Sequence, residues 1–182
     1  MAYRNGTYIA FHANGARTPG TSDLDYYRLL TAWAAHKDIE FKFVDSHEKN
    51  AAIRDGSKQE TLRARLRDRL NNSKQMVLVI GDTTFMDDDW VPFEITHAVD
   101  RCGLPIIAAY TGIRARITSA ESLRPWWPNA LRERIDNYSA RVIHVPFRQR
   151  PLLAAIERFT LSDLPAGALT TWSVEIYNMW GI

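Results

Sequence analysis

The chain has 182 residues, which is long enough for one compact domain with a sizeable hydrophobic core. Hydrophobic residues make up 46% and charged residues 24%, and the formal net charge of +2 gives no strong preference for nucleic acid or a membrane surface. The single cysteine, Cys102, excludes an intrachain disulfide, and the sequence has neither a signal-peptide core nor a run of about 20 apolar residues. We therefore expect a cytoplasmic protein that binds neither nucleic acid nor a membrane.

Strand-like and helix-like segments alternate along the chain. Five short apolar runs are typical of strands, at residues 7–11, 41–44, 76–80, 105–110 and 141–145. The segments between them carry apolar residues at helical spacing, and the clearest begins with the capping pair Ser57 and Glu60. Strands separated by helices predict an α/β fold with a doubly wound parallel sheet. For five strands the flavodoxin-like order 2-1-3-4-5 is the natural prediction.

Residues 1–160 account for this predicted domain, and residues 161–182 form an extension. Trp172, Ile176 and Tyr177 recur at helical spacing there. The pattern predicts a C-terminal helix packed on or near the domain. A helix that binds a partner is the alternative.

Glu94 is the most informative residue of the chain. It ends the segment Trp90-Val91-Pro92-Phe93-Glu94, which follows the third predicted strand and an acidic run at 87–89. Pro92 indicates that a helix begins here, at the carboxyl edge of the sheet, where folds of this class bind ligands. Because Trp90 and Glu94 are four residues apart, an indole and a carboxylate can address one ligand. A second interpretation stays open, in which Glu94 only complements the helix dipole.

Polar residues also follow the first two predicted strands, at the same edge of the sheet. His12 and Asn14 either point into the crevice or form a turn selected for its Asn-Gly geometry. The loop that contains Asp45 and His47 suits a substrate lid, and an ordinary surface loop explains it equally well. The aspartates at 87–89 favour a solvated loop over a cation site, so no metal site is predicted.

Taken together, these residues resemble a TIR-like domain of the bacterial branch that forms the TIR component of Thoeris anti-phage systems. The first predicted strand at 8–11, the loop at 45–56 and the segment 66–82 carry part of the resemblance. The most specific match is the W-x-x-x-E element from Trp90 to Glu94. The resemblance covers about residues 7–110. It implies a TIR fold, which is flavodoxin-like, and cleavage of NAD between nicotinamide and ribose, with NAD as the substrate and no cofactor.

In that family the glutamate of the W-x-x-x-E element is catalytic, and it corresponds to Glu94. The resemblance implies that Glu94 engages the nicotinamide ribose while nicotinamide leaves from a transition state with oxocarbenium character. The ADP-ribosyl group is then expected to give a cyclic or conjugated nucleotide that signals to a separate effector protein. Self-association is expected as well. By their positions, the residues expected to bind substrate are Phe11, His12, Asn14, Asp45, His47, Asp82, Thr83 and Trp90.

The sequence departs from the family at two of these positions, since many TIR domains have serine or acidic residues where this chain has His12 and Asn14. The cysteine that often precedes the glutamate element is also missing. Two other functions stay open: a non-catalytic TIR module that acts by assembly, and a nucleoside ribosyl-transfer enzyme of related fold. Glu94 and Trp90 favour an NAD-cleaving enzyme, because an adaptor has no need for them.

Overall fold

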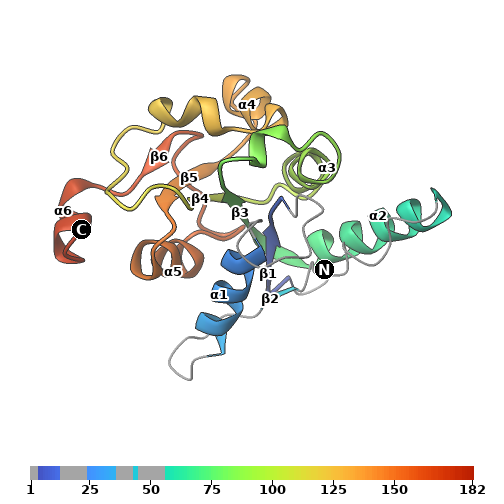
Figure 1. The fold of residues 1–182 in the computed structure, drawn as a ribbon, viewed down its shortest axis with the longest axis horizontal. Helices are drawn as coiled ribbons and strands as arrows, with labels where there is room; N and C mark the ends of the chain where they lie inside the picture. Colours follow the sequence, from blue (N-terminus) through green and yellow to red (C-terminus); the bar gives the residue numbers. More distant parts are fainter. Residues whose placement is uncertain (1–3, 13–23, 36–42, 45–55) are drawn as a thin grey trace.

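One parallel β-sheet organises the protein (Figure 1). The computed structural model describes residues 4–12, 24–35, 43–44 and 56–182. The strands are β1 (Gly6–Ala10), β2 (Phe43–Val44), β3 (Ser73–Ile80), β4 (Ile106–Tyr110), β5 (Val142–Pro146) and β6 (Thr170–Thr171). Their order, β2-β1-β3-β4-β5-β6, contains the predicted order 2-1-3-4-5 and confirms the flavodoxin-like α/β arrangement.

The short edge strand β6 was not predicted. It pairs in parallel with β5 through Ile143 with Thr170 and His144 with Thr171. Two threonines carry no periodic pattern of their own, so local sequence could not identify them as a strand. The pairing ties the C-terminal extension directly to the sheet, while the division of the chain at residue 160 stays a prediction.

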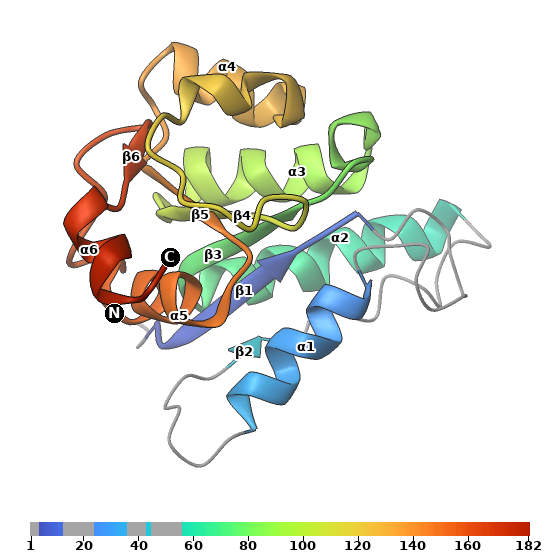
Figure 2. The same cartoon turned by 60° about the vertical axis from the view of Figure 1, so that its left-hand side comes forward.

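Helices cover both faces of the sheet (Figure 2). They are α1 (Leu24–Ala34), α2 (Gly56–Asn71), α3 (Trp90–Thr96), α4 (Asn129–Asp136), α5 (Gln149–Arg158) and α6 (Val174–Met179). A π-helical turn at His97–Arg101 continues α3, and 3-10 turns lie at Thr84–Met86 and Glu121–Trp126. Within the described residues, no helix is both long enough and apolar enough to cross a membrane.

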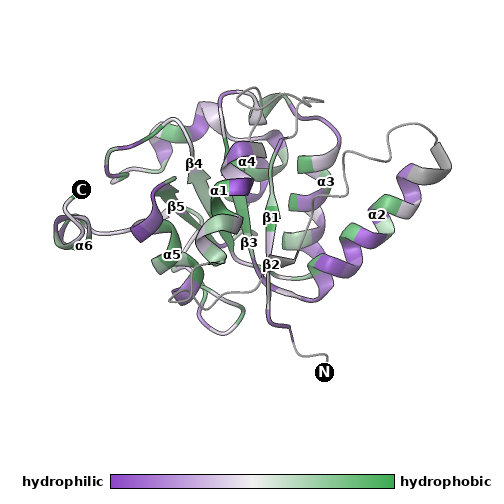
Figure 3. Ribbon diagram, turned by 60° about the horizontal axis from the view of Figure 1, so that its bottom comes forward, coloured by the Kyte–Doolittle hydropathy of each residue, from purple (hydrophilic) through white to green (hydrophobic). Residues whose placement is uncertain are grey.

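Two hydrophobic clusters lie on opposite faces of the sheet. One joins the sheet to α2, α3 and α4, and the other joins it to α1, α5 and α6. Because both faces are covered, the central strands are mostly apolar, whereas α2 carries alternating polar and apolar bands (Figure 3). The predicted core stripe of the α3 segment is confirmed, since Ile95, Ala98, Val99 and Cys102 are all buried.

The side-chain alternation along β1 decides which residues face which helices. Tyr8 and Ala10 belong to the cluster under α2 and α3, whereas Ile9 and Phe11 belong to the cluster under α1 and α5. The face that carries Tyr8 is therefore the face on which α3 packs.

The C-terminal helix α6 packs on the α1 and α5 side. Ser173 caps it by accepting a hydrogen bond from the amide of Ile176, and Tyr177 is completely buried. The indole of Trp172 donates a hydrogen bond to the carbonyl of Pro151 at 3.2 Å, which joins the extension to the first turn of α5.

Candidate active site

The loop between β3 and α3 places a helix N-terminus at the carboxyl edge of the sheet. The amide of Gly81 donates to Oγ1 of Thr84 at 2.8 Å, which closes the turn after β3. Oδ1 of Asp87 accepts hydrogen bonds from the amides of Asp89 at 3.0 Å and Trp90 at 2.9 Å. Asp87 thus satisfies amides at the start of α3 and complements the helix dipole.

Glu94 lies on the inner side of α3, against β1. Its side chain is fully buried, and the hydroxyl of Tyr8 donates a hydrogen bond to Oε1 of Glu94 at 2.5 Å. Tyr8 is itself completely buried. The carboxyl group of Glu94 is therefore oriented by a tyrosine across the core, and both interpretations of Glu94 stay predictions.

The environment of Tyr8 keeps the phenol protonated. Burial raises the pKa of Tyr8 well above its usual value, and the charge of Glu94 and the hydrogen bond to it act in the same direction. The guanidinium of Arg69 on α2 opposes the shift. Tyr8 is therefore a permanent hydrogen-bond donor to Glu94, which gives this carboxyl group a defined orientation.

Trp90 is held by α2. The guanidinium of Arg63 lies 5.8 Å from the ring centroid of Trp90 and 5.4 Å from that of Phe93. The same guanidinium pairs with Oδ1 of Asp89 at 2.5 Å, and Gln59 donates to the other oxygen of Asp89 at 3.1 Å. These contacts clamp the start of α3 against α2. The predicted stacking of Trp90 on a substrate ring stays a prediction, since its described ring contact is to Arg63.

His12 and Phe11 diverge after β1. Nδ1 of His12 lies 3.9 Å from Oδ2 of Asp87, so His12 adjoins the residue that caps α3. Phe11 is buried on the other face of the sheet, where its ring stacks on Tyr27 with the centroids 5.2 Å apart. The structure thus brings His12, but not Phe11, to the face that carries Glu94.

The remaining predicted site residues are spread over the same edge or lie outside the described residues. Asp82 is exposed and Thr83 half-buried, directly after β3, and neither has a described contact with Glu94. Asn14, Asp45 and His47 lie outside the described residues.

Among the described residues, no group of three or more histidine, cysteine, aspartate or glutamate side chains is arranged to hold a metal ion. Two of the three aspartates at 87–89 have structural partners instead. Asp87 caps α3, and Asp89 pairs with Arg63. The acidic run therefore helps to orient the helix that carries Glu94.

Tyr8 is the site residue that sequence reasoning missed. A tyrosine in an apolar strand fits its β propensity, so its residue type did not mark it as functional. One signal was present: Tyr8, Ala10 and His12 share one face of the strand by alternation, and two of the three carry polar groups.

The comparison with known families agrees with this geometry. The sequence model described as Thoeris protein ThsB, TIR-like domain, matches residues 8–116, which is more than half of the chain. The match begins at Tyr8, includes the W-x-x-x-E element and extends past β4. The parallel sheet and its strand order are those expected of a TIR-like domain. The chain belongs to the TIR-like domain family of Thoeris protein ThsB, the TIR component of an anti-phage defence system.

Proposed function

We propose that this protein cleaves NAD at the bond between nicotinamide and ribose and forms a signalling nucleotide derived from ADP-ribose in anti-phage defence. The observation that carries the proposal is the buried carboxyl group of Glu94. It lies in the family's W-x-x-x-E element, on the helix that begins at the carboxyl edge of the sheet, in a hydrogen bond with Tyr8.

The proposed chemistry uses Glu94 in its carboxylate form. The carboxylate accepts hydrogen bonds from the hydroxyls of the nicotinamide ribose and stabilises the positive charge that develops at the anomeric carbon. The bond from that carbon to the nicotinamide nitrogen breaks, and its electron pair leaves with neutral nicotinamide. Charge stabilisation of this kind is stronger in a site that excludes water, and Glu94 is fully buried.

We propose a cyclic or conjugated product rather than ADP-ribose, which requires that the site closes again over bound NAD. Water must reach the anomeric carbon to give ADP-ribose, and a site closed to water suppresses that reaction. A ribose hydroxyl or an adenine nitrogen of the same nucleotide, or a group of another bound small molecule, then attacks the carbon. An attacking hydroxyl or amino group releases its proton, and an attacking ring nitrogen carries the positive charge until the base loses a proton. The resulting nucleotide is the proposed messenger to a separate effector protein.

Burial also requires that the edge opens before NAD reaches Glu94. We propose that self-association accompanies this opening, so turnover by a dilute chain is low and rises with protein concentration. Exposed apolar residues at the same edge support a contact there, since Phe85 is 44% and Met86 62% exposed directly before the cap of α3.

The test is turnover of NAD by purified protein at high concentration, with and without lysate of phage-infected cells, with the products resolved by mass spectrometry. Nicotinamide release is expected from the parent and from Glu133→Gln, which alters an exposed carboxylate on α4. It is expected to disappear in Glu94→Gln, whose amide can still accept from Tyr8. Equal turnover by folded Glu94→Gln would refute the proposal.

The exposed pair Phe85 and Met86 also favours a second function, a non-catalytic module that acts by assembly. In that case Glu94 contributes only to packing and to the hydrogen bond with Tyr8. Folded protein that assembles but turns over no NAD under any of these conditions would establish this second function.

A further inference from the structure

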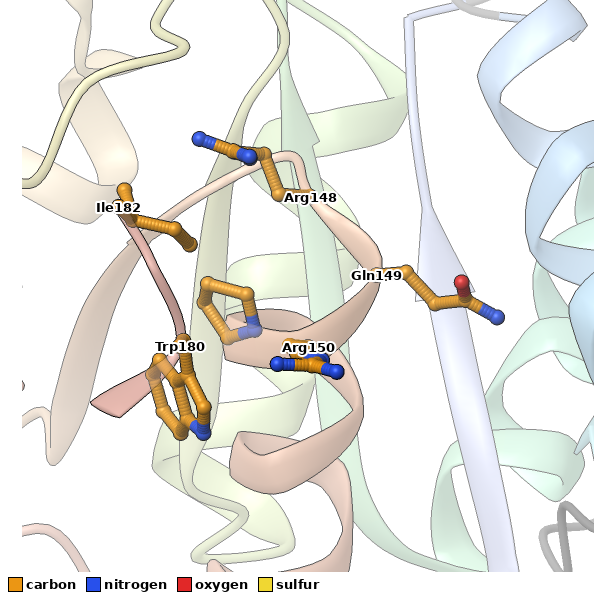
Figure 4. A pocket seen from close by; sticks show the side chains of 6 residues that line it. Arg148, Gln149, Arg150, Trp180 and Ile182 are labelled. Atoms are coloured by element: carbon orange, nitrogen blue, oxygen red, sulfur yellow. The ribbon is translucent and has the colours of Figure 1, made fainter. Parts of the chain in front are cut away.

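A cavity lies where the start of α5 meets α6, on the part of the chain outside the family match (Figure 4). Its volume is about 370 Å³, within the range of small-molecule sites. It is lined by Arg148, Gln149, Arg150, Pro151, Trp180 and Ile182. We propose that this cavity binds a small phosphate-bearing ligand with a planar ring, of the nucleoside diphosphate class.

The lining is cationic. Arg148 and Arg150 contribute two guanidinium groups, and no lining residue carries an acidic side chain. Within the described residues neither guanidinium has a carboxylate partner. Other arginines are paired, as in Arg124 with Asp136 at 2.6 Å. Two guanidinium groups at one concave surface, of which Arg148 also donates to a backbone carbonyl, match the charge and geometry of phosphate oxygens.

Two further arginines lie beside this cavity. Nη1 of Arg148 donates to the carbonyl of Arg114 at 3.1 Å, which holds the loop after β4 against the start of α5. Nη1 of Arg116 donates to Oδ1 of Asn178 on α6 at 3.2 Å. The loop after β4 therefore lies against both walls, and the guanidinium of Arg116 adds positive charge beside α6.

The start of α5 adds backbone donors. Arg148 is the N-cap residue, and its side chain makes no capping hydrogen bond. The amides of Gln149 and Arg150, at the first two positions of this ten-residue helix, have no hydrogen-bond partner among the described residues. These N–H groups and the helix dipole reinforce the guanidinium groups at the same place.

Trp180 supplies a flat apolar wall. Its ring is half-buried and is held edge-to-face by Trp172 at 5.5 Å and by Tyr177 at 5.9 Å between centroids. In Figure 4, Arg148 and Ile182 lie on one side of the site, Trp180 and Arg150 lie on the other, and Gln149 points away from Trp180. A ring stacked on this indole lies beside Arg150, and its phosphates extend across the site towards Arg148.

The proposal is independent of catalysis at Glu94. It assigns a role to the C-terminal segment, since the residues directly after α6 provide the aromatic wall and the start of α5 provides the cationic one. Without this segment, the start of α5 would be an exposed basic surface with no aromatic side chain on which a ligand ring could stack.

The test is calorimetric titration of the full chain with ADP, pyrophosphate and adenosine. ADP is expected to bind most tightly, pyrophosphate more weakly, and adenosine least, because the cationic wall provides most of the attraction. We expect Arg150→Gln to weaken ADP binding; Arg150 has no described hydrogen bond that the change would break. We expect the double variant, Arg148→Gln with Arg150→Gln, to weaken ADP binding by roughly tenfold or more. Arg158→Gln, at the other end of α5, is the matched control and is expected to bind as the parent does.

Two more variants locate the ligand. Trp180→Leu is expected to weaken ADP binding and leave pyrophosphate binding unchanged. Glu94→Gln is expected to leave both unchanged, whatever its effect on NAD turnover. Melting temperatures establish that each variant is folded. The proposal is overturned by absent ADP binding at millimolar concentration, by equal binding in Arg150→Gln and Arg158→Gln, or by loss of binding in Glu94→Gln.

Discussion

The hydrogen bond between Tyr8 and Glu94 predicts a specific response to Tyr8→Phe. The substitution keeps the ring in the core and removes only the hydroxyl that donates to Oε1 of Glu94 at 2.5 Å. Both side chains are fully buried, so water does not replace the lost donor without a rearrangement. Leaving a buried acceptor without its donor costs about 1–3 kcal/mol, and we expect the free energy of unfolding to fall by that amount.

Urea denaturation measures this loss as a lower midpoint with an unchanged slope. Tyr138→Phe removes the hydroxyl of a tyrosine that is 85% exposed and is expected to shift the free energy by less than about 0.5 kcal/mol. Glu94→Gln is expected to cost less than Tyr8→Phe, because its amide oxygen still accepts from Tyr8. The double variant then shows whether the two changes are coupled.

Turnover of NAD provides a second measurement on the same variant. A carboxyl group without its orienting donor is misplaced, and misplacement of a reacting group reduces rates by roughly a hundredfold. We expect nicotinamide release by Tyr8→Phe to fall mainly in kcat. Unchanged stability together with unchanged turnover would show that the Tyr8 hydroxyl neither stabilises nor orients Glu94.

Three further predictions concern stability. Burial lowers the pKa of His144 to about 4, so the unfolded chain, with an ordinary pKa near 6.5, binds more protons between these values. The resulting contribution to the free energy of unfolding is complete above about pH 6.5 and is lost as the pH falls towards 4, by about 3 kcal/mol in all. Unfolding midpoints measured against pH should show this loss. An unchanged slope of stability against pH in His144→Gln would contradict the assignment to His144. Asp87→Ala removes the acceptor for two amides at the start of α3 and should lower the free energy of unfolding by about 1–2 kcal/mol in thermal denaturation, whereas Asp87→Asn should retain most of it. A Cβ on Gly112 would lie 2.8 Å from the ring of Trp126, so Gly112→Ala should destabilise the protein by about 1–3 kcal/mol. The control is Gly167→Ala, because a Cβ on Gly167 would meet no atom within 4 Å. Equal destabilisation by both variants would contradict the steric explanation.

The candidate site shows which features neighbouring residues predict and which they do not. Pro92, the acidic run and the spacing of Trp90 and Glu94 predicted a helix start with a carboxyl group at the carboxyl edge of the sheet, and the structure has that helix and that edge. Caps and first-turn prolines act over a few residues, so a local pattern can record them. The partner of Glu94 was not predictable in this way, since Tyr8 is 86 residues away.

The neighbours of the site depended on which face of β1 receives α3. Alternation predicts that Phe11 and His12 point to opposite faces, but it does not say which face holds Glu94. The packing of α3 over Tyr8 answers that question and directs Phe11 into the core with Tyr27. The edge strand β6 and the cavity between α5 and α6 likewise arise from pairings between distant segments.

The sequence by itself determined the parallel sheet, the core stripe of α3 and the family, because apolar periodicity and short motifs are properties of neighbouring residues. The strand order 2-1-3-4-5 was the expected one for five strands, and the structure established it. Only the tertiary structure decided that Glu94 is buried, that Tyr8 orients it and that the C-terminal segment completes a cationic cavity. Each of these depends on distances between segments far apart in the chain, which are set when the two faces of the sheet are covered by helices.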